Sequence, residues 1–133
     1  MFVQLRPTAP LRPPGLIEEA LQMMINDPQA DCVRSIRESP KSPYKMWQIY
    51  GKYLKPFIQI GDMESYNFPR QKLPRVYYHD GLLDVIRTTT IMEKKSVTGT
   101  RALPIRVKES FLVVDIDRPV DIVSAEVFLK YNR

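Results

Sequence analysis

The spacing of apolar residues changes twice within residues 1–37, and this change constrains the fold more than any other feature of the chain. A short apolar run, Phe2–Leu5, is typical of a buried strand, and the prolines that follow end it. Residues 13–26 then repeat apolar side chains at helical spacing, and Cys32–Arg37 returns to the alternation of a strand. The order strand, helix, strand predicts an α/β fold in which crossover helices join parallel strands. The apolar side of the helix is expected to be Ile17, Ala20, Leu21 and Met24.

Residues 44–87 are expected to form an arm inserted into this fold. Aromatic residues alternate with lysines on both sides of Gly51, which favours a β-hairpin with one packed face and one solvated face. Residues 59–75 show no regular period and are expected to be extended. Two strand segments, Val76–Tyr78 and Leu82–Ile86, are predicted on either side of a turn at residues 79–81.

Alternating elements resume after the arm. We expect a short helix over Thr88–Lys95, strands over Leu103–Val107 and Phe111–Asp115, and a final helix that opens at Pro119. Residues 1–133 would then be one partial α/β domain, with ligands bound at the carboxyl ends of strands, in the loops 6–12, 38–45 and 115–119. The apolar stripe of the last helix is expected to be Val120, Val123, Val127 and Phe128.

Charge and composition narrow the class of protein. The 20 Lys and Arg residues exceed the 15 Asp and Glu residues and give a net charge of +5, but these cations are scattered along the chain. The densest mixture of cations with aromatics, residues 44–57, is better explained by the hairpin than by a surface for single-stranded nucleic acid. No apolar run reaches the ~20 residues that cross a bilayer, and no signal-peptide pattern opens the chain. We therefore expect a cytoplasmic protein that binds an anionic small molecule, without nucleic-acid or membrane partners. Its single cysteine, Cys32, is expected in the core.

Asp115 and Asp117 are the sharpest candidate for a metal site. Residues two apart on a strand point to the same side, so two carboxylates at its end would converge. Such a pair favours a hard cation, and beside phosphates Mg²⁺ is the natural choice. The alternative is that Asp117 accepts hydrogen bonds from free N–H groups where the helix starts at Pro119.

Two further segments carry candidate ligand-binding side chains. Arg6 and Arg12 lie on a proline-stiffened loop after the first strand, which suits a carboxylate or phosphate, although the loop is also compatible with a solvated surface turn. The segment Pro69–Pro74 holds Arg70 and Gln71 between two prolines. It is compatible with an arm that reaches a ligand or a neighbouring subunit, and equally with a linker.

Five segments together resemble the acylneuraminate cytidylyltransferases, the family of CMP-sialic acid synthetases, in order and in spacing. They are the Q-x-x-P-T-x-P-L-R type loop at Gln4–Arg12, the lysine-bearing turn Ser42–Lys45, the P-R-Q-x-L-P arm at Pro69–Pro74, the turn His79–Gly81, and the D-I-D signature at Val114–Asp121 with Ala125–Glu126. Each segment alone is weak, whereas five in order are specific.

The resemblance implies a nucleotide-diphospho-sugar-transferase-like, Rossmann-like sheet and the transfer of CMP from CTP to a 2-keto sugar acid with release of pyrophosphate. It implies that Asp115 and Asp117 hold Mg²⁺ and that Arg6 and Asp80 contact the substrate. Lys45, Arg70 and Gln71 would bind the sugar acid, with Arg70 supplied to the partner's site in a homodimer.

The chain departs from the family pattern in three places. It begins after the family's triphosphate-binding loop, so it is expected to be the carboxy-terminal portion of the domain and incomplete for catalysis alone. Asp80 and Asp84 replace asparagine and tyrosine, which should change the preferred sugar acid. Arg118 replaces the threonine that caps the last helix. The alternative function is a non-catalytic interaction module that dimerises through the arm.

Overall fold

The computed structural model describes residues 1–61, 64–108 and 110–131. It has a mixed α/β fold and forms two compact units, one made of Met1–Arg37 with His79–Arg133 and the other of Glu38–Tyr78. The predicted arm, 44–87, overlaps the second unit. Among the helices of the described residues, none is long and apolar enough to cross a membrane.

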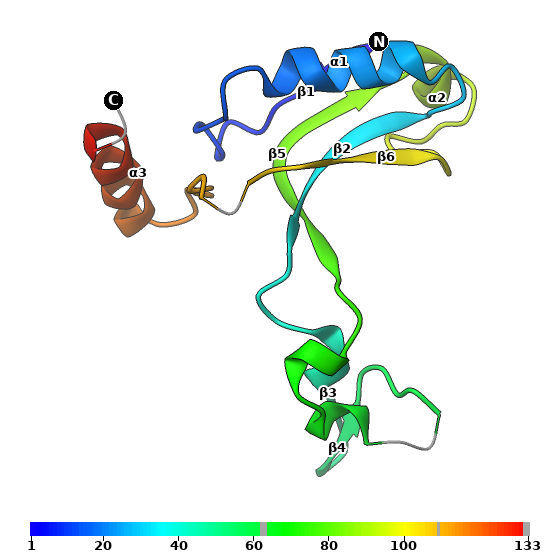
Figure 1. Ribbon diagram of the computed structural model, residues 1–133, viewed down its shortest axis with the longest axis vertical. Coiled ribbons are helices and arrows are strands. Elements are labelled where there is room, and N and C mark those ends of the chain that lie inside the picture. The colour runs from blue at the N-terminus through cyan, green and yellow to red at the C-terminus, as the bar shows by residue number, and fades with distance from the viewer. Residues whose placement is uncertain (62–63, 109, 132–133) are drawn as a thin grey trace. The chain divides into compact units, whose positions relative to one another are not determined.

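The sheet of the first unit is four-stranded and mixed, in the order β1-β5-β2-β6 (Figure 1). Its strands are β1 (Phe2–Gln4), β2 (Cys32–Glu38), β5 (Tyr77–Ile86) and β6 (Ala102–Arg106). The pairing of β1 with β5 is antiparallel, whereas that of β2 with β6 is parallel and places Cys32 opposite Ala102. The predicted order strand, helix, strand is therefore present, but β5 lies between the two strands that the helix connects.

Helix α1 (Leu16–Asn26) lies along one face of this sheet (Figure 1). It begins at Leu16, three residues later than the predicted start, after Gly15 adopts the left-handed φ of 79°. Ala20 and Met24 are fully buried, and complete burial of a side chain such as Met24 contributes about 1.5–3 kcal/mol. The core beneath the helix includes Val33, Leu83, Val85 and Ile105.

Strand β5 passes through the segment 79–81, where the sequence predicted a turn. Gly81 takes a φ of 76°, and the backbone N–H of Leu82 donates to Oδ1 of Asp80 at 3.1 Å. This local distortion accommodates the residues that favour turns without ending the strand. The predicted turn is therefore wrong, and a continuous strand carries residues 77–86 across the sheet.

The segment after β6 also differs from the prediction. Residues 111–115 do not form a strand, although the N–H of Ile116 donates to the carbonyl of Thr8 at 2.7 Å. Helices α2 (Thr88–Met92) and α3 (Pro119–Tyr131) are present, and α3 opens at Pro119 as expected. Its buried residue is Ala125, which packs with Leu11 and Val114. The predicted stripe is wrong because Val120, Val123 and Val127 are exposed and only Phe128 is half-buried.

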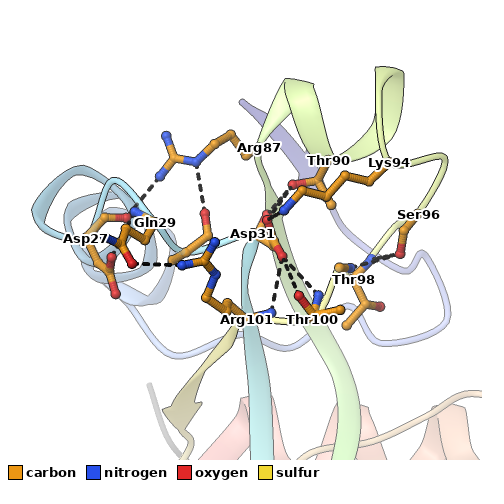
Figure 2. Close-up of polar contacts among 12 residues, drawn as sticks. Asp27, Gln29, Asp31, Arg87, Thr90, Lys94, Ser96, Thr98, Thr100 and Arg101 are labelled. Atoms are coloured by element: carbon orange, nitrogen blue, oxygen red, sulfur yellow. Dashed lines mark hydrogen bonds and ion pairs between the residues drawn. The ribbon is translucent and has the colours of Figure 1, made fainter.

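A buried carboxylate, Asp31, joins the segments at one end of the sheet (Figure 2). The ammonium group of Lys94 lies 2.5 Å from its Oδ1, and the N–H groups of Thr100 and Arg101 donate to Oδ2 at 2.9 and 3.2 Å. Gly99 approaches so closely that an added Cβ would lie 2.4 Å from the Cβ and Oδ2 of Asp31. The carboxylate thereby fixes the loop between α2 and β6.

Arg87 completes this end of the sheet by binding the end of α1 (Figure 2). Its guanidinium donates to the carbonyls of Met24, Asp27 and Ala30 at 2.9–3.0 Å. The last carbonyls of a helix have no partner within the helix, so these bonds satisfy groups that would otherwise need water.

The second unit contains a hairpin of β3 (Trp47–Tyr50) and β4 (Tyr53–Pro56). Ile49 lies opposite Leu54 and Trp47 opposite Pro56, so these four side chains share one face. One face of the hairpin was expected to be packed, but on this face Ile49 is 82% and Leu54 62% exposed. Trp47 contacts the ring of Tyr66, with centroids 4.6 Å apart. The rest of the unit includes three short 3-10 helices, Pro43–Lys45, Ser65–Asn67 and Arg70–Lys72.

Candidate functional site

Two of the predicted substrate-binding residues, Arg6 and Asp80, lie together on the first unit. The side chain of Arg6 crosses β5 at Gly81, where an added Cβ would meet its Cδ at 3.1 Å and its Nη1 at 3.2 Å. Gly81 follows Asp80 directly in the strand. A glycine at this position therefore leaves room for the Arg6 side chain against β5, one residue after Asp80.

Asp80 is a buried carboxylate with one oxygen unused. The hydroxyl of Ser35 donates to its Oδ1 at 2.5 Å, and Ser35 in turn accepts the N–H of Leu83 at 3.0 Å. Its Oδ2 is buried and accepts no hydrogen bond from the described residues. Leaving a buried acceptor unpaired costs about 1–3 kcal/mol, so a hydrogen-bond donor to this atom would be favourable.

A second polar group on the same strand consists of His79 and Asp84, joined to Arg34 of β2. The Nε of Arg34 donates to Oδ1 of Asp84 at 2.7 Å, and its Nη2 donates to Thr98 Oγ1 at 3.0 Å. Nε2 of His79 lies 3.3 Å from Oδ2 of Asp84 but makes no hydrogen bond with a described residue. The carboxylate of Asp84 is thus largely neutralised by Arg34.

The environment of His79 disfavours its protonated form. Burial is the largest effect on the pKa of His79 and lowers it from the ordinary value of 6.5, the nearby Asp84 raises it, and the guanidiniums of Arg34 and Arg6 lower it. The net shift of this pKa is downward.

Arg12 has a different role from Arg6. Its Nε donates to the carbonyl of Leu82 at 3.0 Å and its Nη2 to the carbonyl of Arg6 at 2.8 Å. These bonds tie the loop 6–12 to β5 and set the direction in which Arg6 leaves the backbone. Arg12 is therefore a positioning residue and not the solvated side chain of the alternative interpretation, whereas Arg6 is exposed.

Arg70 and Gln71 lie in the second unit and line a pocket of about 380 Å³. One guanidinium nitrogen of Arg70 donates to the carbonyl of Ser39 at 2.9 Å and lies 3.7 Å from Glu38. Arg75 also lines the pocket, together with Ser42, whose buried hydroxyl has no described partner. Lys45 is exposed at the end of its 3-10 helix and does not line this pocket.

The predicted metal ligands, Asp115 and Asp117, are exposed in the irregular segment before α3. Their carboxylates have no hydrogen bond or ion pair within the described ranges, in which no group of three or more His, Cys, Asp or Glu side chains gathers. The strand that was expected to align them is absent, so their convergence does not follow from strand geometry. Two free carboxylates nevertheless suit Mg²⁺, which keeps several waters and takes further oxygens from phosphates.

Asp121, rather than Asp117, accepts the free N–H groups at the start of α3. Its Oδ2 receives the backbone N–H of Arg118 at 2.8 Å and that of Asp117 at 3.2 Å. Burial opposes ionisation of this carboxyl, but the hydrogen bonds from Arg118 and Asp117 lower the pKa of Asp121. The alternative in which the Asp117 carboxylate serves the helix start is therefore wrong.

Ser35, Arg34 and His79 were missed as members of the polar cluster. Arg34 and Asp84 are charged residues within apolar strand segments. Because charged residues are seldom buried unless they are paired, their positions could have indicated a buried ion pair. His79 was interpreted as a turn residue because Asp80 and Gly81 follow it. Comparison of the sequence with protein-family models and with curated proteins finds no match.

Proposed function

We propose that this chain carries the sugar-acid half of a cytidylyltransferase of the acylneuraminate type, on a Rossmann-like sheet. The enzyme would transfer CMP from CTP to a 2-keto sugar acid and release pyrophosphate. The observation that supports this function best is that the Arg6 side chain lies against Gly81, the residue after Asp80, although Arg6 and Asp80 are far apart in the sequence. The Arg6 guanidinium would bind the carboxylate of the sugar acid, and Oδ2 of Asp80 would accept one of its hydroxyls.

The two aspartates that depart from the family pattern have different consequences. Asp84 is paired with Arg34 at 2.7 Å, so it adds little negative charge to the site. Asp80 keeps an unpaired acceptor. A substrate with a hydroxyl or ammonium donor at that position should therefore bind better than one with an acceptor. A substrate without the donor would leave the Asp80 oxygen buried and unpaired, and enzymes discriminate strongly against such substrates.

Asp115 and Asp117 would hold Mg²⁺ in this proposal. The ion, when bound, supplies positive charge to the phosphates of the nucleotide. Lys45, Arg70 and Gln71 would bind polar groups of the sugar acid, and Arg70 would do so in the site of a second copy in a homodimer. The exposed apolar face of the hairpin, at Trp47, Ile49 and Leu54, supports such an association because large unpaired apolar surfaces mark interfaces.

The second candidate function is a non-catalytic module that dimerises through the second unit. The exposed apolar face of the hairpin also favours this module, because a protein can associate through such a face without having a catalytic site. The two candidates differ in what happens when a proposed metal ligand is changed.

Formation of CMP-sugar from CTP, Mg²⁺ and a set of 2-keto sugar acids that includes N-acetylneuraminate, assayed with the full-length protein, tests the proposal. We expect product with the unaltered protein, at least 100-fold less product with Asp115→Asn, and unchanged activity with Glu93→Gln, a matched change at an exposed carboxylate. Full activity of Asp115→Asn, or inactivity of the unaltered protein with every sugar acid, would contradict the proposal. If the unaltered protein is inactive but forms a dimer, the interaction module is favoured.

A further inference from the structure

A pocket of about 460 Å³ opens at the start of α1 and shares no residue with the proposed sugar-acid or metal sites. Its walls come from three segments of the first unit: the turn into α1, the segment after β6, and α3. The apolar residues that line it are Pro13, Pro14, Leu16, Val107, Phe111 and Phe128.

The floor of this pocket is rigid and apolar. Leu16 and Val107 are 5% and 6% exposed, and both belong to the main core. Phe111 and Phe128 meet edge to face, with ring centroids 5.4 Å apart and planes inclined by 73°. A third ring would find two aromatic partners and two prolines at this position, a setting in which aromatic groups pack favourably.

The polar residues of the pocket are predominantly cationic. Arg106 and Lys108 follow one another closely at the end of β6, and Ser110 adds a hydroxyl. Among the described residues that line the pocket, Glu19 is the one carboxylate. Lys108 is exposed, and its ammonium group makes no hydrogen bond or ion pair with a described residue, so it is available to a ligand.

We propose that this pocket binds a small carboxylate that carries an aromatic ring. The ring lies against Phe111 and Phe128, and the carboxylate faces Lys108 and Arg106. The volume is within the range of about 300–1,000 Å³ that is typical of small-molecule sites. A ring bearing a cation would instead meet two like charges, and a carboxylate without a ring would leave the apolar floor unfilled.

Three probes of similar shape separate these contributions. 3-Phenylpropionate has the ring and the carboxylate, 2-phenylethylamine has the ring with a cation, and propionate lacks the ring. Titration of the ¹⁵N-labelled chain should give a Kd on the order of 1 mM for 3-phenylpropionate, as expected for a fragment of this size. The shifted amides should be those of Leu16, Val107 and Phe111. The other two probes should bind at least about fivefold more weakly.

Substitutions of exposed lysines then test the position of the site and leave its buried apolar residues unchanged. Lys108→Glu should weaken 3-phenylpropionate by roughly threefold to tenfold. Lys130→Glu, the same change at an exposed position of α3 that does not line the pocket, should have no effect. The proposal is overturned if no amide of the pocket shifts at about 10 mM probe, if 2-phenylethylamine binds as well as 3-phenylpropionate, or if Lys108→Glu binds like the unaltered chain.

Discussion

Gly99 offers the sharpest quantitative test of the structure, because two independent features require a glycine there. Its φ is +70°, a conformation that other residues adopt at a cost. An added Cβ would lie 2.4 Å from the Cβ and Oδ2 of Asp31 and 2.5 Å from its Cγ. Gly99→Ala should therefore strain the backbone and also displace the buried carboxylate that holds Lys94, Thr100 and Arg101.

The expected destabilisation is the sum of these two effects. The left-handed backbone costs an alanine about 1 kcal/mol, and overpacking of a buried site costs about 1–3 kcal/mol. The free energy of unfolding should thus fall by about 2–4 kcal/mol. With an entropy of unfolding of about 2.1 cal/mol/K per residue, 1 kcal/mol corresponds to roughly 3–4 °C for a chain of this length, so Tm should fall by roughly 7–14 °C.

Thermal unfolding followed by circular dichroism measures this difference. Gly15→Ala is the matched control, because Gly15 has a φ of +79° but nothing within 4 Å of an added Cβ. It should show the backbone effect alone, about 1 kcal/mol and roughly 3–4 °C. In an Asp31→Gly background, Gly99→Ala should cost no more than this control. Equal losses for the two alanine variants in the unaltered background would refute the close approach of Gly99 to Asp31.

Three other predictions concern charge and the exposed hairpin. The hydrogen bond from Lys94, followed by that from Thr100, holds the pKa of Asp31 well below its ordinary value of 3.8, so the stability from ionised Asp31 is present above about pH 4 and is lost as pH falls. Urea unfolding should therefore show a smaller loss between pH 5 and pH 3 for Asp31→Asn than for the unaltered chain, and equal losses would contradict the network. Burial lowers the pKa of His79 below 6.5, so the neutral imidazole contributes stability above that pH, and this stability is lost on acidification. The decrease in Tm between pH 7 and pH 5 should therefore be smaller in His79→Gln than in the unaltered chain. A larger decrease in that variant would argue against a neutral imidazole. Ile49→Ser should change the free energy of unfolding by less than about 0.5 kcal/mol but weaken self-association in sedimentation experiments. Gln48→Ala, on the opposite face of the hairpin, should leave self-association unchanged. Identical sedimentation of both variants would exclude the Ile49 face from the interface.

Local patterns predicted the helices and most of the strands because their apolar spacing is intact. The helix over residues 13–26 and the strand at Cys32 are examples, and the hairpin around Gly51 is another. The position of β5 between β1 and β2 was not predictable in this way. Strand order depends on contacts between distant segments, such as Val3 with Val85, and the spacing of residues along the chain carries no information about them.

The errors at residues 79–81 and 111–115 have separate physical causes. Asp80 and Gly81 favour turns, but the bonds from Ser35 and Leu82 to Asp80 let the strand continue through them. Residues 111–115 have a β-type composition, but Phe111 packs against Phe128 and Val114 against α3, and within the described parts of the chain no strand pairs with them.

The candidate site was predicted in part. Arg6 and Asp80 were expected to contact substrate, and the structure brings their segments together at Gly81. Arg34 and Ser35 could not be assigned to the same cluster, because their partners Asp84 and Asp80 lie on another strand. His79 was missed because residues 79–81 were interpreted as a turn, whereas β5 continues through them to Asp84. The placement of Arg12 as a positioning residue likewise depends on the carbonyl of Leu82, which is distant in the sequence.

Calorimetric titration of a set of 2-keto sugar acids, N-acetylneuraminate among them, into the protein tests the central claim most directly, because it measures binding at Arg6 and Asp80 without requiring catalysis. We expect saturable binding that weakens at least about tenfold with Arg6→Ala, where a charge-assisted bond to the carboxylate is lost, and with Gly81→Ala, where the added Cβ displaces the Arg6 side chain. Lys130→Ala, a change at an exposed cation of α3, should leave the affinity unchanged. Absence of binding, or binding that Arg6→Ala and Lys130→Ala affect equally, would contradict a sugar-acid site at Arg6 and Asp80.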